Sequence, residues 1–198
     1  TYFTLLNSYL TDRYFQVHFK SAYSNIANIR AGVSQGGILS PILYNVYASD
    51  QPTSPNTIVA DYADDKLIIS INESPIVASH NLQNHLSLME IYKYNNWKIK
   101  VNQTKSNHTT FTLKLGQCPA VTLFGTQIPI TPTVKYLGLT FDRILTCSQH
   151  TRAKRLQLNL RLRMLKSLLV NNKHTNLNIK LLMYKSLIKP IWTYGLQL

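Results

Sequence analysis

Three carboxylates are grouped closely enough to do chemistry together. Of the eight acidic residues in this 198-residue chain, three fall within five positions, at Asp61, Asp64 and Asp65. Neighbouring carboxylates repel one another, so a pair at the tip of an otherwise apolar hairpin is unfavourable unless a cation neutralises it. Mg²⁺ prefers oxygen ligands and is usually held by one or two carboxylates together with substrate phosphates. Because aspartate is also a favoured turn residue, the spacing alone leaves two alternatives open, a magnesium site and a solvated turn.

The elements around this cluster predict a hairpin. Two β-rich runs, residues 57–62 and 66–71, are separated by three residues, which is the length of a hairpin loop. A loop punctuated by glycines precedes them at residues 31–41 and ends in a serine followed by proline. Ser40 is suited to the N-cap position and the proline to the first helical position. We therefore expect a helix from Ser40 to about Ser49.

The remaining pattern predicts a mixed α+β body followed by helices, with the break near residue 148. The other expected strands cover residues 14–20, 25–30, 97–101, 111–115, 121–124 and 134–141. The other expected helices cover residues 2–10, 75 to about 95, 152–170 and 177–191. One helix carries an apolar stripe at i, i+4 spacing, which is core by default: Leu156, Leu160, Met164 and Leu168.

The charge of the chain is distributed unevenly. There are 21 basic and 8 acidic residues, a formal net charge of +13, and residues 151–198 hold ten basic residues and no acidic one. This asymmetry favours a polyanionic partner, with nucleic acid first and an anionic membrane surface second. No apolar run approaches the roughly 18 residues that cross a bilayer, so a membrane-spanning protein is excluded. Cys118 and Cys147 have no metal-ligand spacing, and a reducing compartment is the default.

Five segments carry a family resemblance. Tyr62-Ala63-Asp64-Asp65 resembles the catalytic Tyr-x-Asp-Asp hairpin of reverse transcriptases. Residues 29–45 resemble the loop and helix that line the incoming nucleotide in that family, and residues 97–106 the strand and loop after its palm helix. Residues 134–142 are similar to the hairpin that grips the primer. Residues 189–195 look most like the thumb of jockey-type non-LTR retrotransposon polymerases of insects.

The resemblance implies roles for the catalytic residues. In the family, the two hairpin aspartates bind a pair of Mg²⁺ ions, or Mn²⁺, that activate the primer 3′-hydroxyl and steady the leaving pyrophosphate. Asp64 and Asp65 match those positions. Gln35 and Gly36 match the nucleotide pocket, and Lys105 matches a lysine beside the pyrophosphate. The alternatives are that the loop glycines serve only a turn and that Lys105 is an ordinary solvated lysine.

Further residues match positions that contact nucleic acid. Tyr62 corresponds to a residue near the primer end, with a core aromatic as the alternative. Tyr136, Leu137 and Gly138 would support the primer backbone, with an ordinary buried strand as the alternative. Basic thumb residues would contact the phosphates of an RNA/DNA duplex without sequence preference: Lys154, Arg155, Arg161 and Arg163. Since no acidic partner exists in that segment, i, i+4 ion pairing does not explain this charge run.

The resemblance predicts an α+β fold in two domains. Residues 1–148 would form a partial polymerase palm, an antiparallel sheet with helices on one face, including the primer-grip hairpin. Residues 149–198 would form an all-helical thumb or connection. The implied function is RNA-templated DNA synthesis by two-metal transfer from a dNTP to a DNA primer, in the nucleus or cytoplasm. The alternatives are a non-catalytic nucleic-acid-binding remnant of such an element and a binder of anionic membranes.

The chain departs from the family pattern at several positions. The family carries a third metal-binding aspartate upstream of its first palm helix, and the first aspartate here, Asp12, follows a helix in a turn. We therefore expect this polypeptide to be a fragment that extends primers poorly or not at all by itself. Ser34, Gly37 and Lys66 stand where proline, serine and a small residue are usual. Lys66 is placed to offset the additional charge of Asp61.

Overall fold

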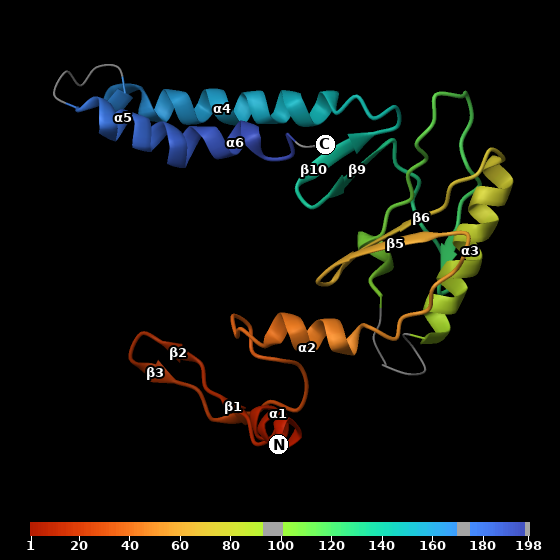
Figure 1. Cartoon of the computed structure of the whole chain (residues 1–198), viewed down its shortest axis with the longest axis horizontal. Coiled ribbons are helices and arrows are strands. Elements are labelled where there is room, and N and C mark those ends of the chain that lie inside the picture. Colours follow the sequence, from red (N-terminus) through yellow and green to blue (C-terminus); the bar gives the residue numbers. More distant parts are fainter. Residues whose placement is uncertain (93–100, 170–174, 197–198) are drawn as a thin grey trace. The chain divides into compact units, whose positions relative to one another are not determined.

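The computed structural model describes residues 1–92, 101–169 and 175–196 (Figure 1). The chain divides into two compact units, Thr1–Ile69 and Ser70–Leu198. The first unit contains two helices and six short strands, listed in chain order: α1 (Tyr2–Leu10), β1 (Tyr14–Phe15), β2 (His18–Phe19), β3 (Ala22–Tyr23), β4 (Ala27–Asn28), α2 (Ser40–Tyr47), β5 (Ile58–Tyr62) and β6 (Asp65–Ile69).

After α1 the chain forms an interrupted two-stranded ribbon. β1 pairs with β4 and β2 pairs with β3, both antiparallel. Between the two ladders, the Val17 N–H donates to the Ser24 hydroxyl at 2.9 Å, and the Ser24 N–H donates to the Val17 carbonyl at 2.9 Å. The predictions of single strands over residues 14–20 and 25–30 are therefore wrong. A serine side chain takes the place of a backbone partner and breaks the ladder.

The predicted helix at residue 40 is confirmed, but its predicted cap is wrong. α2 begins at Ser40, which is already helical, and Leu39 occupies the N-cap position without a side-chain capping bond. The Ser40 hydroxyl instead donates to the carbonyl of Ser34, six residues earlier. Ser40 therefore ties the preceding loop to the helix rather than capping the helix.

β5 and β6 form the predicted hairpin. Their antiparallel register runs from Ile58 opposite Ile69 to Tyr62 opposite Asp65. The loop has two residues rather than three, because Asp65 already belongs to β6. Ala63, the first loop residue, has a φ of +52°, a left-handed conformation that is unusual for a residue with a Cβ.

In the residues that the structure describes, the second unit contains four short strands and most of the helical residues. Its elements in chain order are α3 (Pro75–Ile91), the 3₁₀ turn Gln103–Lys105, β7 (Thr122–Leu123), β8 (Thr126–Gln127), β9 (Thr133–Tyr136), β10 (Leu139–Asp142), α4 (Ser148–Leu169), α5 (Leu177–Met183), the π-helical turn Tyr184–Ile188 and α6 (Lys189–Thr193). The predicted helix from residue 75 is confirmed to residue 91. Its predicted extension to 95 and most of the predicted strand over 97–101 lie outside the described residues.

The core of this unit lies between α3 and the β7–β8 hairpin. Leu86, Met89, Val121 and Leu123 are buried there, and each such side chain contributes about 1.5–3 kcal/mol relative to exposure. Polar side chains of α3 also bond the backbone opposite. Gln83 Oε1 accepts from the Thr122 N–H at 2.7 Å, and Glu90 Oε1 accepts from the Phe124 N–H at 2.6 Å. Side chains of α3 therefore accept hydrogen bonds from backbone N–H groups that a neighbouring strand would pair in a longer sheet.

The segment 111–115, predicted as a strand, is a loop in the structure. The Arg143 side chain closes this loop by donating to the carbonyls of Lys114 and Gly116, the latter at 2.8 Å. The Thr112 N–H donates to the Arg143 carbonyl at 3.0 Å. A β-rich composition fails to form a strand here because one arginine satisfies the carbonyls that a neighbouring strand would otherwise pair.

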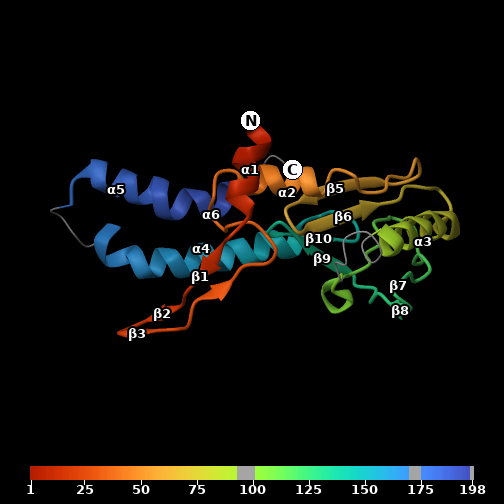
Figure 2. The ribbon, with the colours of Figure 1, turned by 90° about the horizontal axis from the view of Figure 1, so that it is seen from below.

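The last helices pack on one another and on β10 (Figure 2). α4 contacts both β10 and α6. The predicted helix over residues 177–191 is interrupted by the π-helical turn, where the Lys189 N–H donates to Tyr184, five residues back. Pro190 follows at once, and its missing N–H excludes the regular helical bond at that position.

The apolar stripe predicted as core is exposed, so that prediction is wrong. Leu156, Leu160 and Met164 are 59%, 60% and 72% exposed. The half-buried positions of α4 lie on another face: His150, Lys154, Leu158, Leu165 and Leu169. Since leucine occurs on more than one face of α4, helical periodicity alone does not determine which face the neighbouring elements cover.

The α+β class is confirmed in general terms. In the described part of the chain, strands pair as five separate two-stranded antiparallel ladders. The palm with its antiparallel sheet, the thumb and the boundary at 148 stay predictions. Across the described ranges, no helix combines the length and apolar character needed to cross a membrane.

Candidate active site

The two candidate metal ligands lie at the β5–β6 turn. Asp64 is the second loop residue, and Asp65 opens β6 opposite Tyr62. Asp61 pairs with Lys66, one position further from the turn, so these two side chains point to the other face of the hairpin. Tyr62 is 64% exposed, which rules out the alternative that it is a core aromatic.

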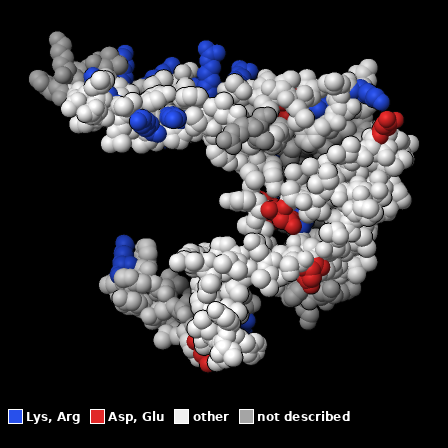
Figure 3. Space-filling view, viewed as in Figure 1, with Lys and Arg blue, Asp and Glu red and all other residues white. Residues whose placement is uncertain are grey.

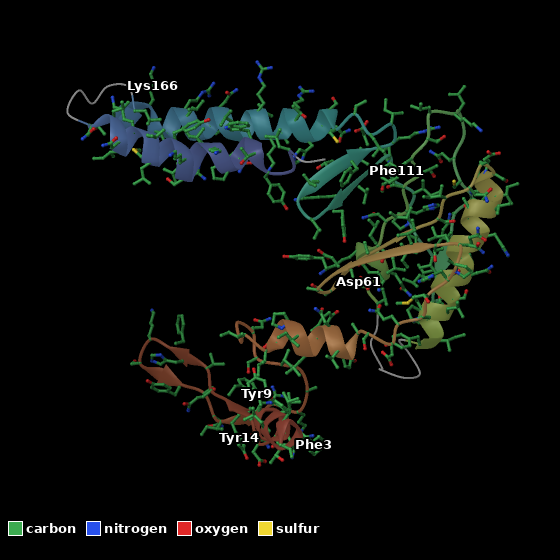
Figure 4. All side chains as sticks on the ribbon, viewed as in Figure 1. Phe3, Tyr9, Tyr14, Asp61, Phe111 and Lys166 are labelled. Carbon is green, nitrogen blue, oxygen red and sulfur yellow. The ribbon has the colours of Figure 1, made fainter. Side chains whose placement is uncertain are left out.

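Asp61, which Figure 4 marks on the β5–β6 hairpin, is neutralised by its own neighbours. Lys66 Nζ lies 2.5 Å from Asp61 Oδ1, and Gln51 Nε2 donates to Asp61 Oδ2 at 3.3 Å. Gln51 Nε2 also donates to the carbonyl of Ala48, directly after α2, at 2.7 Å. Asp61 therefore connects the hairpin to the end of α2, and its charge is offset as the sequence predicted.

A tyrosine of α2 lies within the electrostatic influence of the carboxylates. Burial, and then the negative charges of Asp64 and Asp61, raise the pKa of Tyr44 above its ordinary value of 10.0. Both views show α2 beside the turn end of the β5–β6 hairpin (Figures 1 and 2). Sequence reasoning assigned Tyr44 no role. The available signal was its place in the segment 29–45, one helical turn after Pro41.

The chemistry of the turn fits a divalent cation. Within the described residues, no hydrogen bond or ion pair engages the carboxylates of Asp64 and Asp65. Hard cations such as Mg²⁺ take oxygen ligands of this kind. The described ranges contain no group of three His, Cys, Asp or Glu side chains that could enclose a metal ion. The donor set therefore suits a cation that completes its shell with water and substrate phosphates.

The glycine loop is held at both ends. Arg13 Nη2 donates to the Gly32 carbonyl at 2.7 Å, and Arg13 Nε donates to the Leu10 carbonyl at the end of α1 at 3.1 Å. At the other end, Ser40 donates to Ser34. Gln35 and Gly36 lie exposed between these anchors, and Gly36 has a φ of +82°. Sequence reasoning missed Arg13, because a single arginine after a helix carries no signal for a partner 19 residues away.

The structure also explains one departure from the family pattern. A Cβ at Gly37 would lie 2.8 Å from Ser40 Oγ and 2.9 Å from Tyr9 Oη. These distances are too short for ordinary contact, so a serine at position 37 would require the Ser40 hydroxyl and the Tyr9 side chain to move. The glycine is compatible with the position that Ser40 takes in this chain.

The other candidate residues belong to the second unit. Lys105 ends the 3₁₀ turn and is exposed. Tyr136, Leu137 and Gly138 lie at the β9–β10 turn, where Tyr136 pairs with Leu139. Arg155, Arg161 and Arg163 are exposed on α4, and Lys154 is half-buried there. Figure 3 shows Lys and Arg side chains along the surface of the helices α4, α5 and α6.

Comparison with known protein families shows the family to which the chain belongs. Residues 1–141 match the family described as reverse transcriptase (RNA-dependent DNA polymerase). The chain belongs to the reverse transcriptase family. The matched range includes the β5–β6 turn, the glycine loop and most of the β9–β10 hairpin.

The reverse transcriptase chain is similar to three curated proteins of Drosophila melanogaster. It is 34% identical to the RNA-directed DNA polymerase from mobile element jockey over 203 residues, 98% of this chain and 22% of that protein. It is 34% identical to the probable RNA-directed DNA polymerase from transposon X-element over 206 residues, 100% of this chain and 22% of that protein.

The third relative, the probable RNA-directed DNA polymerase from transposon BS, is 34% identical over 208 residues, 100% of this chain and 23% of that protein. The reverse transcriptase chain thus spans about a fifth of the length of these relatives. No solved structure matches it.

Proposed function

We propose that this chain is part of an RNA-directed DNA polymerase that transfers a nucleotide from a dNTP to the 3′-hydroxyl of a DNA primer on an RNA template. The observation that supports this proposal most directly is the charge arrangement at the β5–β6 turn. The carboxylates of Asp64 and Asp65 have no hydrogen-bond or ion-pair partner within the described residues, while Asp61 is neutralised by Lys66. Two adjacent uncompensated carboxylates repel each other, and a divalent cation bound between them would relieve that repulsion.

Asp64 and Asp65 would hold the metal. Mg²⁺, or Mn²⁺, bound there would stabilise negative charge on the attacking 3′-oxygen and on the leaving pyrophosphate in an in-line displacement. The protein's own contribution is positioning. Gln51 and Asp61 fasten the hairpin to the end of α2, and Tyr44 of that helix bounds the carboxylate site on one side.

Other residues would hold the substrates. Gln35 and Gly36, between the anchors Arg13 and Ser40, would contact the nucleotide, with Lys105 at the pyrophosphate. Tyr62 would lie near the primer end, and the β9–β10 turn would support the primer backbone. The exposed cations of α4 would bind duplex phosphates without reading sequence.

A primer-extension assay tests the proposal. The polypeptide, alone and joined to the coding sequence that precedes it in its element, is incubated with poly(rA)/oligo(dT), dTTP and Mg²⁺. We expect little incorporation by the polypeptide alone, because two carboxylates form an incomplete ligand set for two ions. The extended protein should incorporate dTTP, and Asp64→Asn should abolish this activity while the matched surface variant Glu73→Gln retains it.

The second candidate function, a non-catalytic nucleic-acid-binding remnant, is favoured by the cationic α4. That function predicts salt-sensitive binding of the hybrid by both proteins and no incorporation by either one. Incorporation that persists in the Asp64→Asn variant would contradict the remnant and would also overturn the role of Asp64 as a metal ligand, since it would place the metal ligands elsewhere.

A further inference from the structure

The turn between β9 and β10 is strained. Its two central residues, Leu137 and Gly138, have φ values of +46° and +77°. A two-residue hairpin favours this left-handed pair because its twist matches the strands. Glycine adopts the conformation readily, but leucine does so only when the surroundings compensate for the steric cost. Something outside the turn must therefore stabilise Leu137.

Tyr194, directly after α6, supplies that stabilisation. Its hydroxyl donates to the carbonyl of Leu137, 57 residues earlier. Its ring covers Gly138, where an added Cβ would lie 3.4 Å from Tyr194 Cε1. The next residue is Gly195, at which a Cβ would overlap the side chain of Leu139. The Tyr-Gly pair is therefore shaped to the β9–β10 turn.

A cation joins this contact from α4. Lys154 Nζ lies 5.2 Å from the centroid of the Tyr194 ring, within the range of a cation–π interaction. Lys154 has no salt bridge with a described acidic residue. The ring therefore holds an ammonium group beside the turn while leaving its N–H donors available to an anion. Tyr194 is 51% exposed, so the contact is accessible and is not part of the core.

We propose that Tyr194 is a positioning residue that holds the β9–β10 turn and Lys154 together as one binding unit for a nucleic-acid phosphate. This inference rests on the proposed function, which places the primer backbone at the turn. It adds that the Tyr194-Gly195 segment acts on the turn rather than on nucleic acid, and that Lys154 needs the tyrosine ring to reach its phosphate.

Binding measurements as a function of salt test this inference on the full 198-residue chain. The probe is a fluorescein-labelled RNA/DNA hybrid, and each neutralised phosphate contributes about 0.9 to the slope of log K against log salt. Tyr194→Phe removes one hydrogen bond and should weaken binding by about two- to tenfold. Tyr194→Ala should also lower the slope by about 0.9, the value for one phosphate. Tyr2→Phe, at a tyrosine that is 88% exposed in the first unit, is the matched control and should leave binding unchanged.

A double mutant separates positioning from general damage. Lys154→Met should lower the slope by the same amount as Tyr194→Ala, and the combined variant should lower it no further, because both changes act on the same phosphate. Additive slopes would overturn the inference. Hydrogen exchange at the amides of residues 136–139 should accelerate in Tyr194→Phe, and unchanged exchange would also overturn it.

The failure of the proposed function has a different signature. If the unmodified chain shows no salt-dependent hybrid binding, the proposed function and the phosphate unit both fail. If the unmodified chain binds the hybrid and Tyr194→Ala binds it with the same affinity and slope, only the role of Tyr194 is overturned.

Discussion

At the scale of single residues, charge compensation separates the acidic groups of the candidate site. Asp61 contacts Lys66 and Gln51, while no hydrogen bond or ion pair with a described residue engages the carboxylates of Asp64 and Asp65. A carboxylate already engaged by an ammonium group is a poor ligand, since binding a metal would require that ion pair to break. Three aspartates that are alike in sequence therefore lie in different charge environments.

This difference is measurable with Mn²⁺ as a spectroscopic substitute for Mg²⁺. Asp64→Asn should weaken Mn²⁺ binding by at least about tenfold. Even the loss of a residue that only supports a metal ligand typically lowers metal affinity by about that factor. Asp61→Asn should leave the affinity within about twofold, because Asp61 is not a ligand. Titration followed by electron paramagnetic resonance gives both values. An equal loss in the two variants would show that Asp61 belongs to the metal site.

At the scale of elements, the faces of α4 differ in what they contribute. Leu158, Leu165 and Leu169 are half-buried, whereas the stripe through Leu160 is exposed. The π-helical turn and α6 pack on α4. Ile188 of the turn and Ile191 of α6 are buried, at 5% and 9% exposed. The stability of the helices α4 to α6 should therefore depend on the contact between α4 and α6, and hardly on the exposed apolar stripe of α4.

Two substitutions test that dependence. Leu160→Ser should change the free energy of unfolding by at most about 0.5 kcal/mol, because the side chain is already in water. Ile188→Ala should lower it by about 2–5 kcal/mol through reduced burial and a cavity. Urea denaturation followed by circular dichroism measures both. A large effect of Leu160→Ser would show that the stripe is covered in solution.

The connection between β10 and α4 should respond to acid. Asp142 accepts hydrogen bonds from the Thr146 hydroxyl at 2.7 Å and the Cys147 N–H at 2.7 Å, and these bonds lower the pKa of Asp142 below its ordinary value of 3.8. A lowered pKa means that the unfolded chain binds the proton more readily. The stabilisation is therefore complete above the ordinary value and is lost as the pH falls through the folded value.

The variant Asp142→Asn isolates this contribution. Its melting temperature should lie below that of the unmodified chain near pH 7, and the two should converge as the pH falls through the lowered pKa of Asp142. Thermal denaturation at a series of pH values provides the comparison. A gap between the two proteins that stays constant down to acid pH would exclude the carboxylate as its cause.

At the scale of the whole molecule, charge is concentrated toward the end of the chain. No acidic residue follows Asp142, while residues 151–198 carry ten basic ones. Binding driven by such a segment releases counterions from the nucleic acid and weakens as salt rises. Affinity for any duplex should therefore depend mainly on charge, and specificity has to come from other parts of the protein.

Charge-matched variants test this conclusion. Replacing Arg155, Arg161 and Arg163 together with glutamine should lower the salt slope by about 0.9 for each phosphate that the variant no longer neutralises. The control replaces three exposed cations outside α4 in the same way: Lys20, Lys114 and Lys185. Fluorescence anisotropy with an RNA/DNA hybrid measures the slopes. Equal slopes for the two triple variants would assign the binding to net charge alone.

The local features of this protein were determined by its sequence. The β5–β6 hairpin follows from two β-rich runs around a short acidic spacer, and the starts of α2 and α3 follow from Pro41 and Pro75. Five short segments, among them the one that holds Asp64 and Asp65, were together sufficient to indicate the family. Each of these features depends on neighbours within a few residues, where side-chain period, turn geometry and backbone restriction act directly.

The partners of the same residues were decided only by the tertiary structure. The sequence does not indicate that Arg13 reaches Gly32, that Gln83 bonds Thr122, or that Tyr194 bonds Leu137. It also predicted the wrong covered face of α4, because leucine lies on more than one side. These outcomes depend on which distant groups meet, and a hydrogen bond or a buried face is specified by both partners together rather than by either segment alone.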